Sequence, residues 1–265
     1  MTKVSKSIIF PFIGDSIGGS QISSIELIKL LKKKNKQVKV LIHSNGPLSD
    51  YLKKQNIDYS NIKLLPNNFY NPFTLFFGIL KCRFRYKNLI NKNLTKNIYT
   101  NDIRMHYFWS LYSFLFGLEH IWHQHSAFNS RRNIIFTKFS SKILTISNFC
   151  KYSFTNEMSS RAKIIPNFFD LDLISKIRNS SKNKYFKKYK LNPNKLYVTY
   201  VGNASKQKRF SLFLDVAKKL KNKFKSQIFF LILGKNLKNL FFINDSSYIF
   251  FDFNYNVLEL LKTSN

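Results

Sequence analysis

Cysteine is scarce in this sequence, and long hydrophobic runs are missing. The 265 residues include two cysteines, Cys82 and Cys150, and their spacing indicates neither a disulfide framework nor a cysteine-bound metal site. No run of about 18 apolar residues occurs, so no membrane-spanning helix is expected. The apolar stretch near the N-terminus is too short for a secretory signal peptide with a cleavage site. These absences predict a cytoplasmic protein, either free or peripheral on the inner face of the cell membrane.

Acidic residues are also few. The chain has 13 Asp and Glu against 44 Lys and Arg, which gives a net charge of +31. Such an excess favours an anionic partner: a membrane surface, a nucleic acid or a phosphorylated substrate. The lysines are spread along the whole chain among many Asn, Ile, Phe and Tyr residues, as in the product of an A/T-rich gene. Because the charge is not gathered on one recognisable motif, we expect no nucleic-acid partner.

What the sequence does contain is a regular alternation of strands and helices. Hydrophobic residues make up 44% of the chain, enough for a packed core. Strands alternating with amphipathic helices predict an α/β fold with doubly wound parallel sheets that helices cover on both faces. We expect a first domain at residues 1–167, a Lys- and Asn-rich linker at 168–195 and a second domain at 196–265. The second domain is expected to be incomplete, because it holds three strands where about five are usual. The expected strands are 6–13, 37–43, 62–66, 97–103, 120–126, 142–148 and 162–167, followed by 196–203, 226–236 and 247–253.

Residues 69–92 combine Phe, Leu and Ile with Lys and Arg in a helical pattern. A surface helix on anionic lipid has this composition. The favoured interpretation is a helix with one face in the core and a basic face in solvent, since amphipathicity is normal for a globular helix.

Two turns resemble ligand loops, because each follows a strand and precedes a helix. In "GDSIGGSQ" the adjacent glycines Gly18 and Gly19 allow backbone amides to approach a ligand or to adopt positive φ. In "YVGNASKQKRF" Gly202 is followed by a basic cluster that includes Lys208. Cations at a helix start are unfavourable, and a bound phosphate would explain them. An ordinary turn for the glycines, and the general lysine excess for the cations, are the alternatives.

Histidines gather in "EHIWHQHSAF", with His106 shortly before. A third metal ligand with a carboxylate or cysteine partner is not apparent, so we expect no metal site. A histidine at the carboxyl end of a strand is better interpreted as a hydrogen-bonding or proton-handling group, and a core histidine is the alternative. The sequence shows neither GxGxxG nor GxxxxGK(S/T), no helical HExxH, no paired catalytic carboxylates and no Ser/His/Asp series.

Taken in order, these segments resemble the GT-B glycosyltransferases of the retaining family 4 type. The segments that carry the resemblance are "GGSQISSIELIKLLKKKNKQVKVL", "NGPLSDYLKKQNID", "NDIRMHYFW", "IWHQHS", "ILTISNFCK", "AKIIPNFFD", "YVGNASKQKRFSLFLDVAKKL" and "FFLILGKN". Each motif is loose, but together they cover nearly the whole chain. The resemblance implies a GT-B-like fold, with two Rossmann-like domains and a nucleotide-sugar donor.

The resemblance also implies roles for single residues. Gly18 and Gly19 match the loop whose amides approach the donor phosphates, and Gly202 matches the glycine that opens the donor domain. Lys208 matches the basic residue that holds the diphosphate. His125 matches the histidine near the transferred sugar, with His123 as the alternative if the strand register differs. Where the family has Arg after the strand glycine, this chain has Asn203, so Lys206 or Arg209 would have to replace that cation.

The implied reaction is the transfer of a hexose from a UDP- or GDP-sugar to a cell-surface polysaccharide or lipid-linked acceptor, with retention of configuration. No cofactor and no metal are expected, since fixed cations stabilise the leaving diphosphate. The family's acidic motif, two Glu separated by seven residues, would follow Asn265, so we expect a truncated chain that lacks much of the donor site. The alternative function is therefore a non-catalytic remnant that binds acceptor, lipid or a partner transferase.

Overall fold

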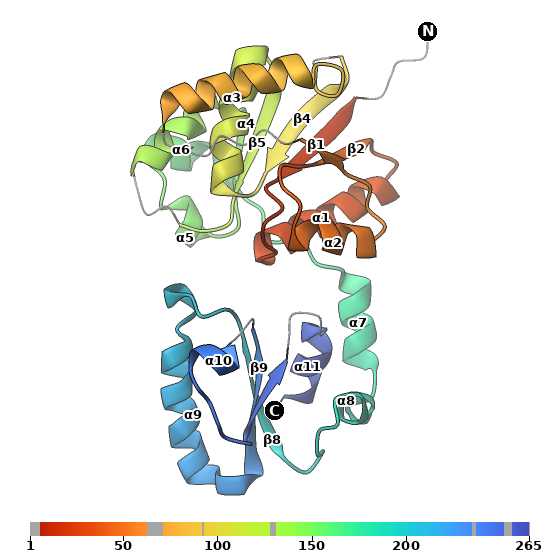
Figure 1. Ribbon diagram of the computed structural model, residues 1–265, viewed down its shortest axis with the longest axis vertical. Coiled ribbons are helices and arrows are strands. Elements are labelled where there is room, and N and C mark those ends of the chain that lie inside the picture. The colour runs from red at the N-terminus through yellow and green to blue at the C-terminus, as the bar shows by residue number, and fades with distance from the viewer. Residues whose placement is uncertain are drawn as a thin grey trace. The chain divides into compact units, whose positions relative to one another are not determined.

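A computed structural model describes residues 6–62, 71–91, 93–127, 131–234, 237–251 and 256–264. The chain divides into two compact units, Met1–Phe169 and Asp170–Asn265. Each unit is an α/β structure built on a parallel sheet (Figure 1). No helix in the described ranges is long and apolar enough to cross a membrane.

The sheet of the first unit has seven parallel strands in the order β3-β2-β1-β4-β5-β6-β7. Its strands are β1 (Ser7–Phe12), β2 (Val38–Ile42), β3 (Ser60–Asn61), β4 (Thr95–Thr100), β5 (Glu119–Gln124), β6 (Lys142–Thr145) and β7 (Ala162–Ile164). The strand order reverses direction between β1 and β4. In open α/β sheets, ligands bind beyond the carboxyl ends of the strands at such a reversal.

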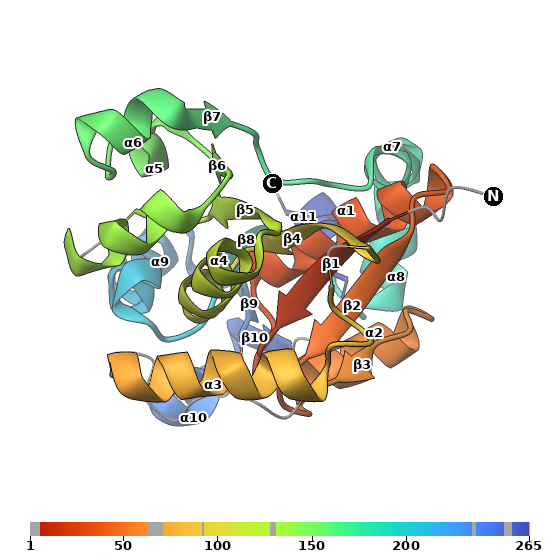
Figure 2. The ribbon, with the colours of Figure 1, turned by 90° about the horizontal axis from the view of Figure 1, so that it is seen from above.

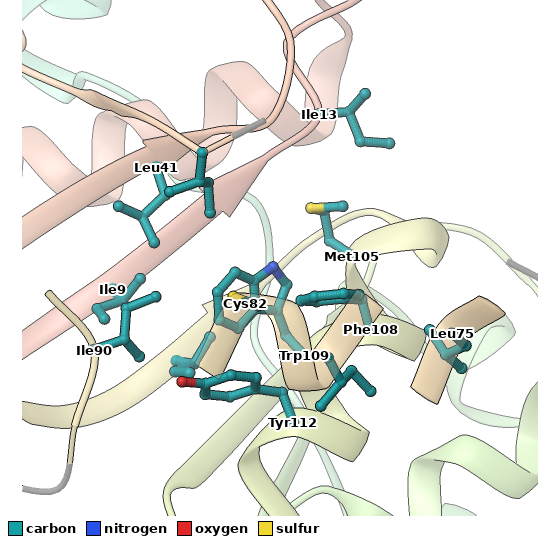
Figure 3. Packing of buried hydrophobic residues seen from close by; sticks show 13 residues of the cluster. Ile9, Ile13, Leu41, Leu75, Cys82, Ile90, Met105, Phe108, Trp109 and Tyr112 are labelled. Atoms are coloured by element: carbon teal, nitrogen blue, oxygen red, sulfur yellow. The ribbon is translucent and has the colours of Figure 1, made fainter. Parts of the chain in front are cut away.

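Helices cover both faces of this sheet, because side chains on neighbouring strand positions point to opposite faces. The helices are α1 (Gly19–Lys33), α2 (Pro47–Lys54), α3 (Pro72–Arg85), α4 (Ile103–Phe116), α5 (Asn148–Lys151) and α6 (Asn156–Arg161), with the 3-10 helix η1 (Arg131–Phe139). Ile9 packs in a core with α3 and α4, in which Trp109 and Tyr112 are fully buried (Figure 3). Its neighbour Phe10 packs on the other face with α1 and α2. The parallel α/β architecture predicted from the alternating pattern is therefore confirmed.

The second unit has a three-stranded parallel sheet in the order β10-β9-β8. Its elements are α7 (Leu171–Asn179), α8 (Lys182–Lys188), β8 (Leu196–Val201), η2 (Lys206–Lys208), α9 (Phe210–Phe224), η3 (Lys225–Gln227), β9 (Ile228–Leu233), α10 (Leu237–Leu240), β10 (Tyr248–Phe251) and α11 (Val257–Thr263). Helix α9 packs on one face of the sheet through Phe210 and Ala217. Helices α8 and α11 pack on the other through Phe186 and Leu260.

Some local expectations differ from the structure. Residues 168–195, expected as a linker, contain α7 and α8, and Phe186 and Leu191 of this segment join the core of the second unit. The exposed Lys and Asn of these short helices gave the segment the composition of a connector. Residues 131–141, expected as an α-helix, form η1 over Arg131–Phe139. The strand expected at 62–66 lies almost entirely outside the described residues, and β3 precedes it at Ser60–Asn61.

Candidate functional site

The turn from β1 to α1 lies at the carboxyl end of the sheet of the first unit, beside the β1–β4 reversal. Gly18 is the N-cap of α1, and its carbonyl accepts the first helical hydrogen bond from the Ile22 amide at 3.1 Å. The Gly18 amide donates to Gln21 Oε1 at 3.0 Å. The first amides of a helix have no intrahelical acceptor, and Gly18 has no side chain to supply one. The start of α1 therefore presents free N–H groups and the positive end of a helix dipole, which together favour an anion.

The backbone at this turn does not require the paired glycines. Gly18 has φ −137° and is extended, so positive φ, one of the two reasons expected for a glycine here, does not apply. A Cβ on Gly19 would meet no atom within 4 Å, and both glycines are exposed. By contrast, Gly14 has φ +105°, and a Cβ there would lie 1.9 Å from the Ser44 carbonyl oxygen. Gly14 shapes the loop, whereas Gly19 leaves open space in front of the helix start; a Cβ on Gly18 would lie 3.1 Å from Gln21 Oε1.

Buried polar contacts hold the start of α1 in place. Asn101 follows β4, and its Nδ2 donates to the Ser20 carbonyl and to Ser24 Oγ, both at 2.8 Å. Ser23 Oγ accepts a hydrogen bond from the Phe168 amide at 2.8 Å. Segments that follow β4 and β7 are thus tied to the first two turns of α1. The free amides are fixed in direction before any ligand arrives, which lowers the cost of binding.

A charged pair lies beside this turn. Arg104, in the first turn of α4, donates to both carboxylate oxygens of Asp15 at 3.0 and 3.4 Å. Its Nε lies 3.6 Å from Asp102 Oδ1, and the same oxygen caps α4 through the Arg104 amide at 2.9 Å. The pair is exposed, so it contributes little to stability. It orients the loop between β1 and α1, and sequence reasoning did not find it because the partners are far apart in the chain.

His123 and His125 lie together but have different surroundings. His123, on β5, is fully buried, and its Nε2 donates to the Ile165 carbonyl at 3.1 Å. This bond leaves Nδ1 as the acceptor for the Tyr99 hydroxyl. His125 follows the strand, with its ring centroid 4.4 Å from that of His123. Both ring nitrogens of His125 are buried without a hydrogen-bond partner, as is Asn167 Oδ1.

Both histidines are neutral at physiological pH. Burial lowers the pKa of each to about 4. The neighbouring His123 further lowers the pKa of His125, and the Asn167 amide partly opposes this effect, although the two side chains do not close a hydrogen bond of ordinary geometry. An uncharged imidazole with free nitrogens is able both to donate to and to accept from the hydroxyl groups of a ligand. His123 therefore has a structural role, whereas both ring nitrogens of His125 are available to bind a ligand.

The other histidines of the first unit belong to the core. Thr100 Oγ1 bridges His106 Nδ1 at 2.6 Å and His120 Nε2 at 2.9 Å. His106 also stacks on Trp122, with ring centroids 4.1 Å apart. His43, which sequence reasoning overlooked, follows β2 and accepts a hydrogen bond from Trp109 Nε1 at 3.3 Å. No three His, Cys, Asp or Glu side chains of the described ranges are grouped to hold a metal ion.

Gly202 follows β8 in the second unit, at the carboxyl end of that sheet. Its amide donates to the Leu233 carbonyl at 3.0 Å. A Cβ on Gly234 would lie 2.1 Å from the carbonyl oxygen of Gly202. The backbones that end β8 and β9 are therefore in direct contact. Gly234 is therefore a required glycine, and Gly202 begins a turn of fixed shape.

The predicted basic cluster lies directly after this turn. Lys206 and Lys208 are in η2, and Arg209 links it to α9 with φ +48°. All three side chains are exposed, and none of them forms an ion pair within the described part of the chain. The Tyr200 hydroxyl shares its one proton between the Asn203 and Lys208 carbonyl oxygens at 3.1 and 3.2 Å, which fixes the loop. An unpaired cation on a fixed loop at a helix start is suited to a phosphate.

No family model matches the chain, and no curated protein matches it. Solved structures do match. Alr3699/HepE of Anabaena, in complex with UDP and glucose, superposes over 97% of this chain and 72% of its own, with TM-score 0.74 and 15% identity. A glycosyltransferase of Rickettsia africae covers 98% and 72%, with TM-score 0.72 and 17% identity. UDP-GlcNAc 2-epimerase of Neisseria meningitidis, bound to UDP-GlcNAc, covers 97% and 74%, with TM-score 0.62 and 12% identity.

These likenesses extend through both units of the chain. The sequence identities are too low for a shared activity to be inferred, so the likenesses establish the fold and nothing about the substrate. They confirm the predicted fold class: the protein has a GT-B-like α/β fold, with Rossmann-like units built on parallel sheets.

Proposed function

We propose that the protein is a glycosyltransferase that moves a hexose from a UDP- or GDP-sugar to a cell-surface polysaccharide or lipid-linked acceptor. One observation carries the proposal. At the β1–β4 reversal, the start of α1 presents free amides that follow Gly18, and Gly19 leaves open space in front of them. This is the arrangement with which α/β proteins bind phosphate groups. The UDP and UDP-GlcNAc complexes of proteins with the same fold support it.

In this proposal the amides that begin α1 form a diphosphate-binding site in the first unit. Gly202 and Lys208 form a phosphate-binding turn in the second unit, where the exposed Lys208 ammonium has no carboxylate partner in the described ranges. The bond from the anomeric carbon to the diphosphate breaks, and its electron pair stays with the diphosphate. The acceptor hydroxyl oxygen forms the new bond to the anomeric carbon, and its proton leaves with the diphosphate. Fixed positive groups stabilise this charge as it develops, without a metal ion.

In the proposed reaction, His125 forms hydrogen bonds to the hydroxyl groups of the transferred sugar. Its ring is neutral because burial lowers its pKa to about 4, and both nitrogens lack a partner. A neutral imidazole forms hydrogen bonds to sugar hydroxyls without adding a charge that would oppose an oxocarbenium-like transition state. We further propose that the configuration of the anomeric carbon is retained, as the resemblance to family 4 implies.

The experiment is a donor titration followed by a turnover assay on this chain. UDP-glucose, UDP-GlcNAc and a GDP-hexose are titrated by calorimetry. Release of UDP or GDP is then measured with and without an alkyl glycoside acceptor. We expect one donor to bind and the acceptor to raise nucleotide release, and the configuration of the product reports on retention.

Two outcomes contradict the proposal. Donor binding without any release of nucleotide would identify the chain as the non-catalytic binding protein that the sequence left as an alternative. Conversion of UDP-GlcNAc to another UDP-sugar without an acceptor would identify an epimerase, which the same fold supports in Neisseria meningitidis.

A further inference from the structure

Helix α3 is apolar on two opposite faces. Leu75, Ile79 and Cys82 are buried in the core of the first unit. On the opposite side lie Phe73, Phe77 and Phe84, which are 74%, 66% and 76% exposed. Spacings of four and seven residues place these three rings in one line along the helix. Figure 2 shows α3 along an outer edge of the first unit. The favoured expectation, a core face with a basic face in solvent, is therefore incomplete, because the phenylalanines are in the solvent.

Cations flank this line, and carboxylates are missing from it. Lys81 follows Phe77 by four residues, and Arg85 follows Lys81 by four, so both lie beside the aromatic line, and both are exposed. The sequence from 59 to 101 contains no Asp or Glu, and neither Lys81 nor Arg85 forms an ion pair within the described ranges. The surface therefore combines exposed aromatic rings with uncompensated positive charge.

Exposed apolar side chains also lie at the end of α4, next to Arg83 of α3. Phe114 and Leu115 are 61% and 42% exposed. They line a groove of about 550 Å³ together with Arg83, Asn91 and Asn93. Arg83 also lies over the Phe116 ring at 5.1 Å, which joins the two helices. Exposed apolar and basic side chains thus occur on both helices.

We propose that this surface, formed by the outer side of α3 and the end of α4, docks on a bilayer that contains anionic phospholipid. The rings of Phe73, Phe77 and Phe84 enter the boundary between headgroups and acyl chains, as the apolar side of an interfacial helix does. Lys81 and Arg85 remain at the level of the lipid phosphates, where each cation adds to the attraction.

Charge favours a bilayer over a second copy of the chain. Two copies that met through this surface would bring Lys81 and Arg85 against the same residues, with no carboxylate in the surface to pair with them, on chains of net charge +31. An anionic bilayer supplies the opposite charge along the whole line. The docking surface does not depend on the proposed transfer reaction, because no donor or acceptor residue belongs to it.

The test is vesicle flotation with the full chain and no nucleotide sugar. Vesicles of phosphatidylglycerol and phosphatidylcholine are compared with vesicles of phosphatidylcholine alone. We expect binding to the anionic vesicles that weakens in 0.5 M salt. Replacing Phe73, Phe77 and Phe84 together by Ser lowers the partition coefficient at least about 30-fold, and K81Q and R85Q each lower it about fivefold.

A matched control replaces three other exposed phenylalanines, Phe149, Phe169 and Phe242, by Ser. This variant keeps the same number of exposed rings on α3 and is expected to bind anionic vesicles like the unchanged protein. Thermal unfolding of both triple variants confirms that they are folded, since the exchanged rings lie in solvent. No binding to anionic vesicles, or an equal loss in both triple variants, overturns the proposal. A dimer in solution that the α3 variant abolishes overturns it as well, because a second copy then covers the surface.

Discussion

The rings of His123 and His125 lie 4.4 Å apart, yet hydrogen bonds hold one of them and leave the other free. His123 uses both nitrogens, through Tyr99 and the Ile165 carbonyl. Both nitrogens of His125 are without a partner. A buried polar group without a partner costs free energy, so a ligand that supplies one gains more from the contact than it would at the surface.

This difference predicts opposite effects for the two substitutions. H123Q breaks two buried hydrogen bonds and is expected to destabilise the protein by about 1–3 kcal/mol. H125Q removes no hydrogen bond within the described residues and is expected to leave stability within about 0.5 kcal/mol, while it lowers turnover about 100-fold. Urea unfolding and the nucleotide-release assay measure the two quantities. Full turnover in H125Q would show that His125 has no part in the reaction.

The glycines of the β1–α1 turn predict a second pair of opposite effects. G14A places a Cβ at φ +105° and 1.9 Å from the Ser44 carbonyl oxygen, so we expect a loss of at least about 2 kcal/mol. G19A meets no atom within 4 Å, and Ala is the better helix former, so stability is unchanged or slightly raised. Since the new methyl group projects into the space in front of the amides, UDP affinity is expected to fall about tenfold. A G19A variant that binds UDP unchanged would place the nucleotide elsewhere.

Lys208 predicts a loss of affinity without a loss of stability. Its side chain is exposed and has no acidic partner in the described ranges, so K208Q is expected to leave the unfolding midpoint unchanged. Loss of one charge-assisted hydrogen bond to the diphosphate weakens donor binding about tenfold or more. K219Q, on the exposed side of α9, is the matched control. Equal affinities of the two variants for UDP would remove Lys208 from the donor site.

The buried histidines make stability depend on pH. Burial lowers the pKa of His43 and His120 to about 3 and that of His123 and His125 to about 4, and it lowers the pKa of His106 as well. In the unfolded chain these groups titrate near 6.5, so below that pH the unfolded state binds more protons. Their stabilising effect is therefore complete above pH 6.5 and is lost as the pH falls toward 4 for His123 and His125, and toward 3 for His43 and His120.

Each of these histidines changes the free energy of unfolding by up to about 1.4 kcal/mol per pH unit in that window. We expect urea midpoints to fall steeply between pH 7 and pH 5. In H120Q, the slope of the free energy of unfolding against pH is expected to decrease by the equivalent of about one proton. Stability that is constant across this window would contradict the buried, neutral state of the cluster.

The fold was predictable because it depends on patterns that are local in the sequence. Ile9 and Phe10 lie in a short apolar run, and the structure sends them to opposite cores, as period-2 alternation requires. The parallel order followed from helices between strands, each of which must cross over a face of the sheet. The placement of Gly18 and Gly19 at the start of α1 followed in the same way, from a strand that ends just before them.

What the sequence did not reveal depends on contacts between distant residues. The hydrogen bonds of Asn101 to Ser20 and Ser24 join positions about 80 residues apart. The need for glycine at position 14 arises from Ser44, which follows β2. The sequence also did not reveal which side of α3 faces the core, because apolar residues occur all around this helix. Packing buries Leu75 and Ile79 and leaves Phe73 and Phe77 exposed.

The most direct test of the account follows the backbone amides of Gly19, Ser20 and Gly202 by NMR as UDP, and then GDP, is added to the isotope-labelled chain. We predict that the amides of Gly19 and Ser20 shift with saturation by at least one of the two nucleotides, and that G19A weakens this response. A nucleotide that saturates the protein without shifting these amides, or no response to either nucleotide, would contradict a diphosphate site at the start of α1.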